Sequence, residues 1–145
     1  MATQTMNADA GQAMADAGRL VLRLAVGVLM LLHGIGKLQG GIGEVLGMVG
    51  KAGLPPALGY LVYVGEVLAP VLMIVGLWTR PAALIAAINM LVAVLLTRPP
   101  GRIFALGEFG NWAIELEGLY FFGAIAVALL GAGRFSVGGR DGRWN

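Results

Sequence analysis

Three side chains that can carry a charge stand in stretches of sequence that are otherwise apolar: His33, Lys37 and Glu66. His33 is the only histidine, and it lies four residues before Lys37, one of two lysines in the chain. Residues four apart share a face of a helix, so these two side chains should point the same way. An imidazole or a carboxyl group can relay a proton, and an ammonium group can stabilise an anion. We therefore predict catalytic roles for His33 and Glu66 and a ligand-binding role for Lys37.

Further polar residues are candidates for ligand contact in the same region, namely Tyr63, Asn89, Glu115 and Tyr120. Residues two apart on a helix do not face the same neighbour, so only one of Glu115 and Glu117 can turn inward. We expect this to be Glu115, with Glu117 facing water or Arg98. The sequence contains no cluster with metal-ligand spacing, so no metal site is predicted.

Each candidate also has a purely structural interpretation. Glu66 could be a neutral carboxyl group bonded to a backbone carbonyl, since burial raises a carboxyl pKa. Lys37 could extend its ammonium group to the membrane surface, and His33 could be a packing residue. Asn89 could join two helices, while Tyr63 and Tyr120 could belong to an interfacial aromatic belt.

The composition is that of an integral membrane protein, with the lipid bilayer as its surroundings. The 145 residues are 58% hydrophobic and 12% charged, with a mean hydropathy of +0.82. A soluble domain has about 25% charged residues. A net charge of +2 without any run of basic residues argues against nucleic-acid binding. The chain has no cysteine, which excludes disulfides, thiolate metal sites and a cysteine nucleophile.

The pattern of apolar stretches predicts an all-α protein, an integral membrane four-helix bundle. Residues 1–18 are expected to form a flexible cytoplasmic tail, in which Asp16 caps the first helix. Residues 19–132 form the membrane domain and 133–145 a polar, flexible C-terminal tail. The four spans are expected at about 19–38, 57–78, 81–97 and 111–131, each near the length that crosses a bilayer.

A glycine-rich segment, 39–56, separates the first two spans. Within it Ile42, Val45, Leu46 and Val49 follow helical spacing, which predicts a short re-entrant or interfacial helix. A plain loop is the alternative. In the second span Pro70 follows Glu66 by four residues and cannot donate a hydrogen bond to its carbonyl, which predicts a kink or a local polar site.

Four spans place both termini on one side of the membrane. That side carries six basic residues and the other side four, so the positive-inside rule favours cytoplasmic termini. In this topology the candidate site residues gather in the outer half of the bundle. The inner half should have almost no polar groups, with Arg19 and Arg23 extending to the lipid headgroups.

Several short motifs occur in a characteristic order along the chain: HGIGKL at 33–38, GLP at 53–55, Gly65-Glu66 with Pro70, GLWTR at 76–80 and GAGRFS at 131–136. This order resembles the DoxX family of small four-helix bacterial membrane proteins. The resemblance implies a plasma-membrane bundle whose relatives include a subunit of an archaeal thiosulfate:quinone oxidoreductase and mycobacterial members with oxidative-stress and sulfur-handling partners. It implies no single reaction and no catalytic assignment.

Two functions from different classes fit these features. The first is a membrane component of an oxidoreductase system, with protein partners, that binds a quinone or similar lipid-soluble ring at the polar cluster in the outer half of the bundle. Without cysteine or a metal-ligand cluster, such a chain would be a quinone-linked subunit and not a complete redox enzyme. The alternative is a non-enzymatic small-ligand carrier or assembly module that docks a partner through the glycine-rich outer loop. Small-residue faces such as Gly36/Gly40 also allow self-association.

Overall fold

The computed structural model describes residues 2–107, 110–139, 142 and 144–145. For residues 2–8 and 100 it describes the backbone alone. In this part of the chain the secondary structure is helical, apart from one isolated bridge between Leu106 and Trp112. The elements are α1 (Ala2–Gly40), α2 (Gly43–Lys51), η1 (Pro56–Leu61), η2 (Val64–Leu68), α3 (Ala69–Val75), α4 (Thr79–Thr97), η3 (Pro100–Arg102) and α5 (Glu115–Leu130). The predicted all-α class is confirmed.

Three helical segments are long and apolar enough to cross a membrane. They cover residues 9–40, 56–75 and 79–97 and agree with the first three predicted spans. The fourth helix, α5, has 16 residues, or about 24 Å at 1.5 Å per residue. That is shorter than the roughly 30 Å of a bilayer's hydrocarbon core. A fourth span therefore stays a prediction.

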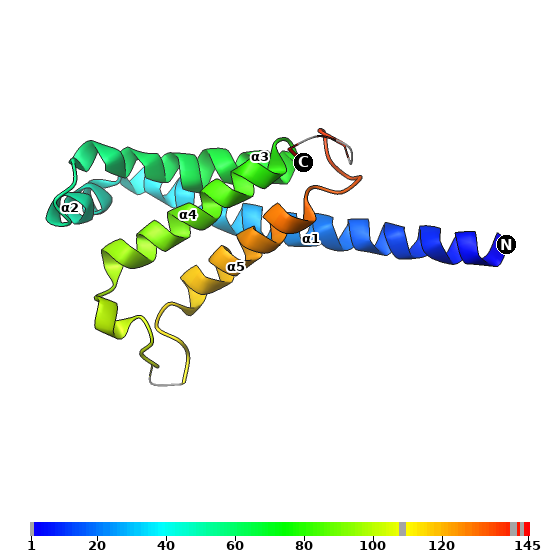
Figure 1. Cartoon of the computed structure of the whole chain (residues 1–145). Helices are drawn as coiled ribbons and strands as arrows, with labels where there is room; N and C mark the ends of the chain where they lie inside the picture. The colour runs from blue at the N-terminus through cyan, green and yellow to red at the C-terminus, as the bar shows by residue number, and fades with distance from the viewer. Residues whose placement is uncertain (1, 108–109, 140–141, 143) are drawn as a thin grey trace.

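Helices α1, α3, α4 and α5 share one apolar core (Figure 1). Helix α4 contributes small side chains to it, and Ala82, Ala83, Ala86 and Ala87 are each at most 2% exposed. Residues three and four apart lie on one face, so these alanines form a flat strip that lets other helices approach closely. Helices α4 and α5 pack against each other, and α3 packs against both α1 and α4.

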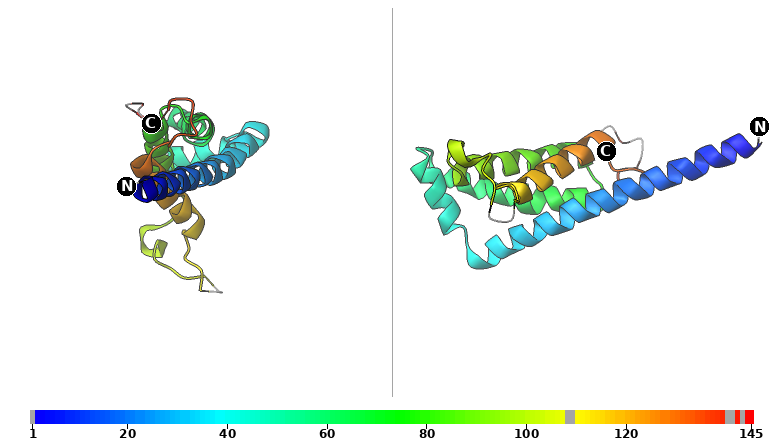
Figure 2. Two further views of the ribbon diagram at one scale, coloured as in Figure 1. Left: turned by 90° about the vertical axis from the view of Figure 1, so that its right-hand side faces the viewer. Right: turned by 90° about the horizontal axis from the view of Figure 1, so that it is seen from below.

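The N-terminal part of α1 differs from the prediction, because the helix begins at Ala2 and not near Arg19. Residues predicted to be a flexible tail are therefore helical, and they extend beyond the other helices (Figures 1 and 2). The reason lies in composition, since this segment is rich in alanine and contains no proline. Asp16 is not a helix cap either. It lies inside α1, is buried, and accepts a hydrogen bond of 2.9 Å from Nη1 of Arg19.

The amphipathic helix predicted between the first two spans is present as α2. Helix α2 packs against η1. Two of its apolar side chains are buried, those of Val49 and of Ile42 at the N-cap position. Leu46 packs so close to Gly59 that a Cβ at this glycine would lie 2.8 Å from Leu46 Cδ2. The segment is therefore a packed helix and not the plain loop of the alternative interpretation.

The described residues of the C-terminal segment, 133–139, 142 and 144–145, fold back onto the turn between α3 and α4, which the sequence did not predict. Asn145 is buried, and its amide donates to the main-chain oxygen of Gly76 at 3.1 Å. Its Oδ1 accepts from both the backbone nitrogen and the hydroxyl of Thr79, at 3.2 Å each. Nε of Arg80 donates to the main-chain oxygen of Asn145 at 2.9 Å. These contacts join the segment to the helices.

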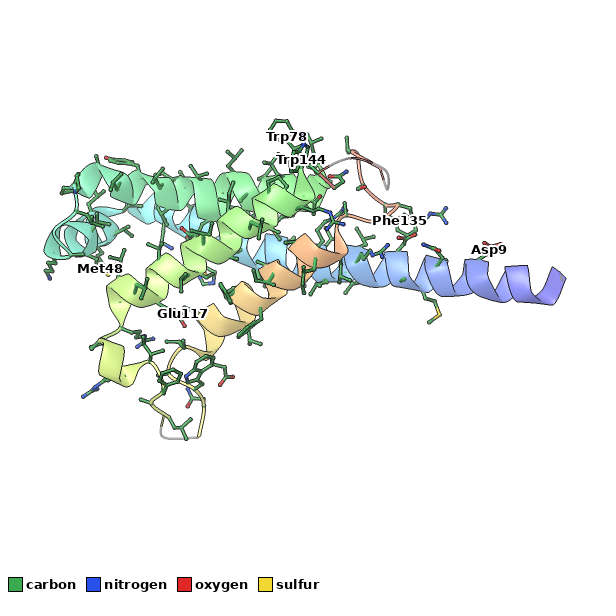
Figure 3. The ribbon with its side chains drawn as sticks, viewed as in Figure 1. Asp9, Met48, Trp78, Glu117, Phe135 and Trp144 are labelled. Carbon is green, nitrogen blue, oxygen red and sulfur yellow. The ribbon has the colours of Figure 1, made fainter. Side chains whose placement is uncertain are left out.

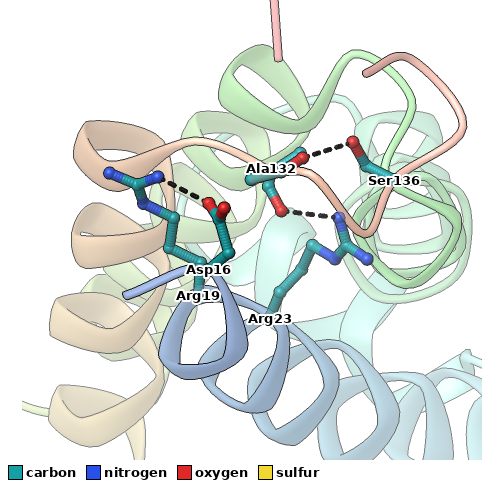
Figure 4. Close-up of polar contacts among 6 residues, drawn as sticks. Asp16, Arg19, Arg23, Ala132 and Ser136 are labelled. Atoms are coloured by element: carbon teal, nitrogen blue, oxygen red, sulfur yellow. Dashed lines mark hydrogen bonds and ion pairs between the residues drawn. The ribbon is translucent and has the colours of Figure 1, made fainter. Parts of the chain in front are cut away.

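Arg23 does not extend to the membrane surface as predicted, because the folded-back segment covers it (Figure 4). Only 1% of Arg23 is exposed. Its Nη1 donates to the carbonyl of Ala132 at 3.1 Å and its Nη2 to that of Phe135 at 2.7 Å. The expectation that this end of the helices has almost no polar groups is therefore also wrong, since Asp16 and Arg23 are both buried there.

Candidate functional site

The carboxylate of Glu66 is the centre of a buried polar cluster formed by three helical segments. Its side chain is 5% exposed and forms an ion pair with Nζ of Lys37, which comes from α1. Nδ2 of Asn89, on α4, donates a hydrogen bond of 3.3 Å to the other carboxylate oxygen. Glu66 itself lies in η2. The first three apolar segments of the chain thus meet at the Glu66 carboxylate.

Tyr63 joins the same cluster through the backbone of α1. Its hydroxyl donates to the main-chain oxygen of Lys37 at 3.3 Å. The same carbonyl also accepts a hydrogen bond of 2.9 Å from the backbone nitrogen of Gly41, just after α1 ends. Four of the predicted site residues, Lys37, Tyr63, Glu66 and Asn89, are therefore brought together.

The backbone around Glu66 departs from an α-helix, and Pro70 explains the departure. Residues Val64–Leu68 form a π-helical turn, closed by a bond from the Ala69 nitrogen to the Val64 carbonyl. Proline has no N–H to donate to the carbonyl four residues earlier, and its ring crowds that carbonyl. A π turn widens the backbone at this point and often marks a functional site. The sequence predicted a kink or a local polar site here, and the structure has a π-helical turn that contains Glu66.

Two glycines allow neighbouring helices to reach the site. A Cβ at Gly34 would lie 2.2 Å from the main-chain oxygen of Glu66, so α1 touches the carbonyl that Pro70 leaves without a donor. A Cβ at Gly65 would lie 2.4 Å from the side chain of Asn89. Larger residues at either position would push α1 or α4 away from the Glu66 carboxylate. The glycines therefore set the distances on which the cluster depends.

His33 and Tyr120 form a separate pair beside this cluster. Their ring centroids are 5.7 Å apart with an interplanar angle of 85°, an edge-to-face contact between α1 and α5. His33 is exposed, and among the contacts of the described residues none joins it to Glu66. The two residues predicted as proton relays are thus not in direct contact.

The inward orientation predicted for Glu115 is wrong. Glu115 is exposed, and its Oε2 accepts a hydrogen bond of 3.1 Å from the backbone nitrogen of Trp112, just before α5. A carboxylate at a helix start is stabilised there by free N–H groups. Glu117 (Figure 3) is less exposed, and its Oε1 lies 3.7 Å from Nη2 of Arg98. Arg98 is one of the two surroundings expected for Glu117.

Sequence reasoning missed the second polar region, where Arg23, Arg80 and Asn145 hold the C-terminal segment. A signal was present, since GLWTR at 76–80 and GAGRFS at 131–136 are both motifs of the resemblance. Their contact depends on the fold-back of the chain, which periodicity does not reveal. Among the described residues, no group of three or more His, Asp or Glu could hold a metal ion.

The cluster can donate and accept hydrogen bonds at one point in an apolar bundle. A lysine ammonium has three N–H donors and an amide has two, so Lys37 and Asn89 each keep donors that Glu66 does not use. The side chain of Lys37 is 30% exposed, so the cluster is not sealed from the surroundings of the protein. A ligand oxygen could therefore bind Lys37 and Asn89 while the carboxylate exchanges a proton.

The sequence model of the DoxX family matches residues 18–99. These residues make up more than half of the chain and contain the whole cluster around Glu66, whereas α5 and the C-terminal segment follow them. No curated protein and no solved structure matches the chain.

A pair of glycines on α1 tests the packing at the site. We expect Gly34→Ala to lower the free energy of unfolding by about 1–3 kcal/mol, because the methyl group overlaps the Glu66 carbonyl. Gly36→Ala is the matched control. No atom lies within 4 Å of a Cβ there, so the higher helix propensity of alanine should leave stability unchanged or raise it by up to about 1 kcal/mol.

The measurement is thermal unfolding of both variants in the same mild detergent, followed by circular dichroism. Equal melting temperatures for Gly34→Ala and Gly36→Ala would show that α1 does not approach the Glu66 carbonyl.

Proposed function

The chain belongs to the DoxX family, and we propose that it is a membrane component of an oxidoreductase system that binds a quinone or a similar lipid-soluble ring at the cluster around Glu66. The observation that carries this proposal is the meeting of Lys37, Glu66 and Asn89 in an apolar helical protein. Ionisable groups in membrane helices are costly and are usually retained for function.

The donor set fits a ring carbonyl. Lys37 and Asn89 have N–H donors beyond those that bind Glu66, and a ring carbonyl oxygen accepts such donors. The side chain of Lys37 is 30% exposed, and in this proposal the ligand approaches the cluster from there. His33 and Tyr120, in edge-to-face contact, could line the path of a flat ring along α1 and α5.

A bound quinone would accept two electrons and two protons and leave as the quinol. In the proposed reaction Lys37 and Asn89 hold a carbonyl oxygen, and the positive charge of Lys37 stabilises the negative charge that develops on it. The Glu66 carboxylate first takes up a proton from the solvent side of Lys37 and then passes it to that oxygen, which returns Glu66 to its ionised form. His33 relays the proton for the second oxygen. The electrons come from a partner redox protein, because this chain has no cysteine to carry them.

We place the protein in the plasma membrane as four spans within residues 19–132, with the tails 1–18 and 133–145 on the cytoplasmic side. Three helices have the length and apolarity to span, and α5 shares their core through Ala124, Val127 and Ala128. This shared core supports α5 as the fourth span, extended by the turn before it. The cluster around Glu66 and helix α2 then lie toward the outer side.

The first prediction from this proposal concerns the bound ligand. The wild-type protein, extracted in mild detergent, should contain about one ring compound per chain, identified by mass spectrometry and by its ultraviolet difference spectrum after borohydride. Glu66→Gln should bind it about 10–100-fold more weakly, because it removes the charge that holds Lys37 beside Asn89 for the ring oxygen. Glu44→Gln, an exposed change in α2, is the control and should retain the compound.

Finding only phospholipid in all three proteins would contradict the redox proposal. It would favour instead a non-enzymatic carrier or an assembly module that docks a partner through the segment around α2. The face of α2 that would do so is open, since no atom lies within 4 Å of a Cβ at Gly43 or Gly47.

The second prediction concerns orientation, and the absence of native cysteine makes it simple to test. A single cysteine at Glu44 (Glu44→Cys) or at Val137 (Val137→Cys) places a thiol at an exposed position on either end of the molecule. A membrane-impermeant maleimide should label Glu44→Cys in right-side-out vesicles and Val137→Cys in inside-out vesicles. The reverse pattern would overturn the orientation, and labelling of both in the same vesicles would overturn an even number of spans.

A further inference from the structure

A second polar hollow lies away from Glu66, where α4 ends and the connection to α5 begins. Its volume is about 500 Å³. Arg98 and Arg102 both line it, together with apolar residues such as Leu106 and Ala113, and its described lining contains no carboxylate. A neighbouring hollow of about 360 Å³ also contains Arg98 and Trp112. Two guanidinium groups at one opening favour an anion.

Backbone contacts hold the connection in shape. Leu106 and Trp112 form an antiparallel bridge, and the Gly107 nitrogen donates to the Asn111 carbonyl at 2.7 Å. The indole nitrogen of Trp112 donates to the Ile103 carbonyl at 2.6 Å. These contacts shape the described part of the connection, and the Arg102 nitrogen donates to the Pro99 carbonyl at 2.9 Å, beside the end of α4.

Among the described residues, the positive charge of this region is only partly balanced by carboxylates. Arg98 lies 3.7 Å from Glu117, a distance at the long end of an ion pair, and 41% of its side chain is exposed. Glu115 binds the backbone of its own helix start. In the part of the chain that the structure describes, Arg102 forms no ion pair with a carboxylate. Both guanidinium groups can therefore bind a further anion.

The surroundings indicate which anion this is. Arg98 directly follows the apolar helix α4, the depth at which a spanning helix meets lipid headgroups. Phe104 and Leu106 are 83% and 71% exposed. The connection lies to one side of the helices, at the end where α2 lies (Figures 1 and 2). Apolar side chains next to arginines, projecting sideways from a membrane helix, suit the boundary between acyl chains and phosphates.

We propose that Arg98 and Arg102 bind the phosphate of an anionic phospholipid in the 500 Å³ hollow, while Phe104 and Leu106 contact its acyl chains. This lipid site is distinct from the cluster around Glu66 and does not depend on the function proposed for that cluster. Its effect is to fix the α4–α5 connection at the membrane surface.

The test is native mass spectrometry of the whole protein in mixed micelles with equal amounts of phosphatidylglycerol and phosphatidylcholine. The wild type should retain phosphatidylglycerol preferentially. Arg102→Gln should lower the ratio of the two bound lipids about five-fold, which corresponds to about 1 kcal/mol for one basic residue at a membrane surface. Lys51→Gln removes an exposed charge from α2 at the same end and should leave the ratio unchanged. Equal losses in Arg102→Gln and Lys51→Gln would overturn the site.

Two further arms identify the ligand and its position. Inorganic phosphate in excess should not displace phosphatidylglycerol, and displacement would show a site for free anions instead of a lipid. With Trp78→Phe and Trp144→Phe, Trp112 is the remaining tryptophan and reports on the adjoining hollow. Brominated phosphatidylglycerol should quench it more than brominated phosphatidylcholine, and Arg102→Gln should remove the difference. Equal quenching by both lipids in the protein with Arg102 would contradict the proposal.

Discussion

The rest of the structure depends on one electrostatic constraint, which is that a carboxylate buried among apolar helices must be paired. Moving a lone charge out of water costs several kcal/mol even after relaxation, and removing one partner of a buried pair is destabilising by about 3–5 kcal/mol. Glu66 meets this constraint with an ammonium group from α1 and an amide from α4. Because the three groups come from different segments, their pairing also fixes how these segments lie against one another.

Small residues are the means by which the segments come close enough. Gly34 allows α1 to touch the carbonyl of Glu66, and Gly65 makes room for Asn89. The alanine strip of α4 extends the same close packing along the helix. In a membrane, where the hydrophobic effect does not drive helices together, such packing and polar contacts between helices are the main source of association. At the other end of the helices, the carbonyls of Ala132 and Phe135, where the chain leaves α5 and folds back, accept hydrogen bonds from Arg23.

The sequence predicted those features that arise locally. Long apolar stretches predicted the first three spans, and the spacing of Ile42 and Val49 predicted α2. Pro70 indicated that the helix is irregular near Glu66. The sequence also indicated which residues belong to the cluster, because a polar residue is conspicuous in an apolar span. It did not predict which of these residues contact one another. The pairing of Lys37 with Glu66 and the fold-back of Asn145 onto Thr79 join residues far apart in the chain, and helical spacing contains no information about such contacts.

The most direct test of the central contact is a distance measurement in a lipid bilayer. Lys51→Arg leaves Lys37 as the only lysine, so a lysine labelled with nitrogen-15 at Nζ reports on that residue alone. Solid-state nuclear magnetic resonance with carbon-13 at the glutamate carboxylates should detect strong dipolar coupling between this nitrogen and one carboxylate carbon, and the coupling should vanish in Glu66→Gln. A lysine signal without such coupling, or coupling that survives in Glu66→Gln, would contradict the pairing of Lys37 with Glu66 on which the proposed site depends.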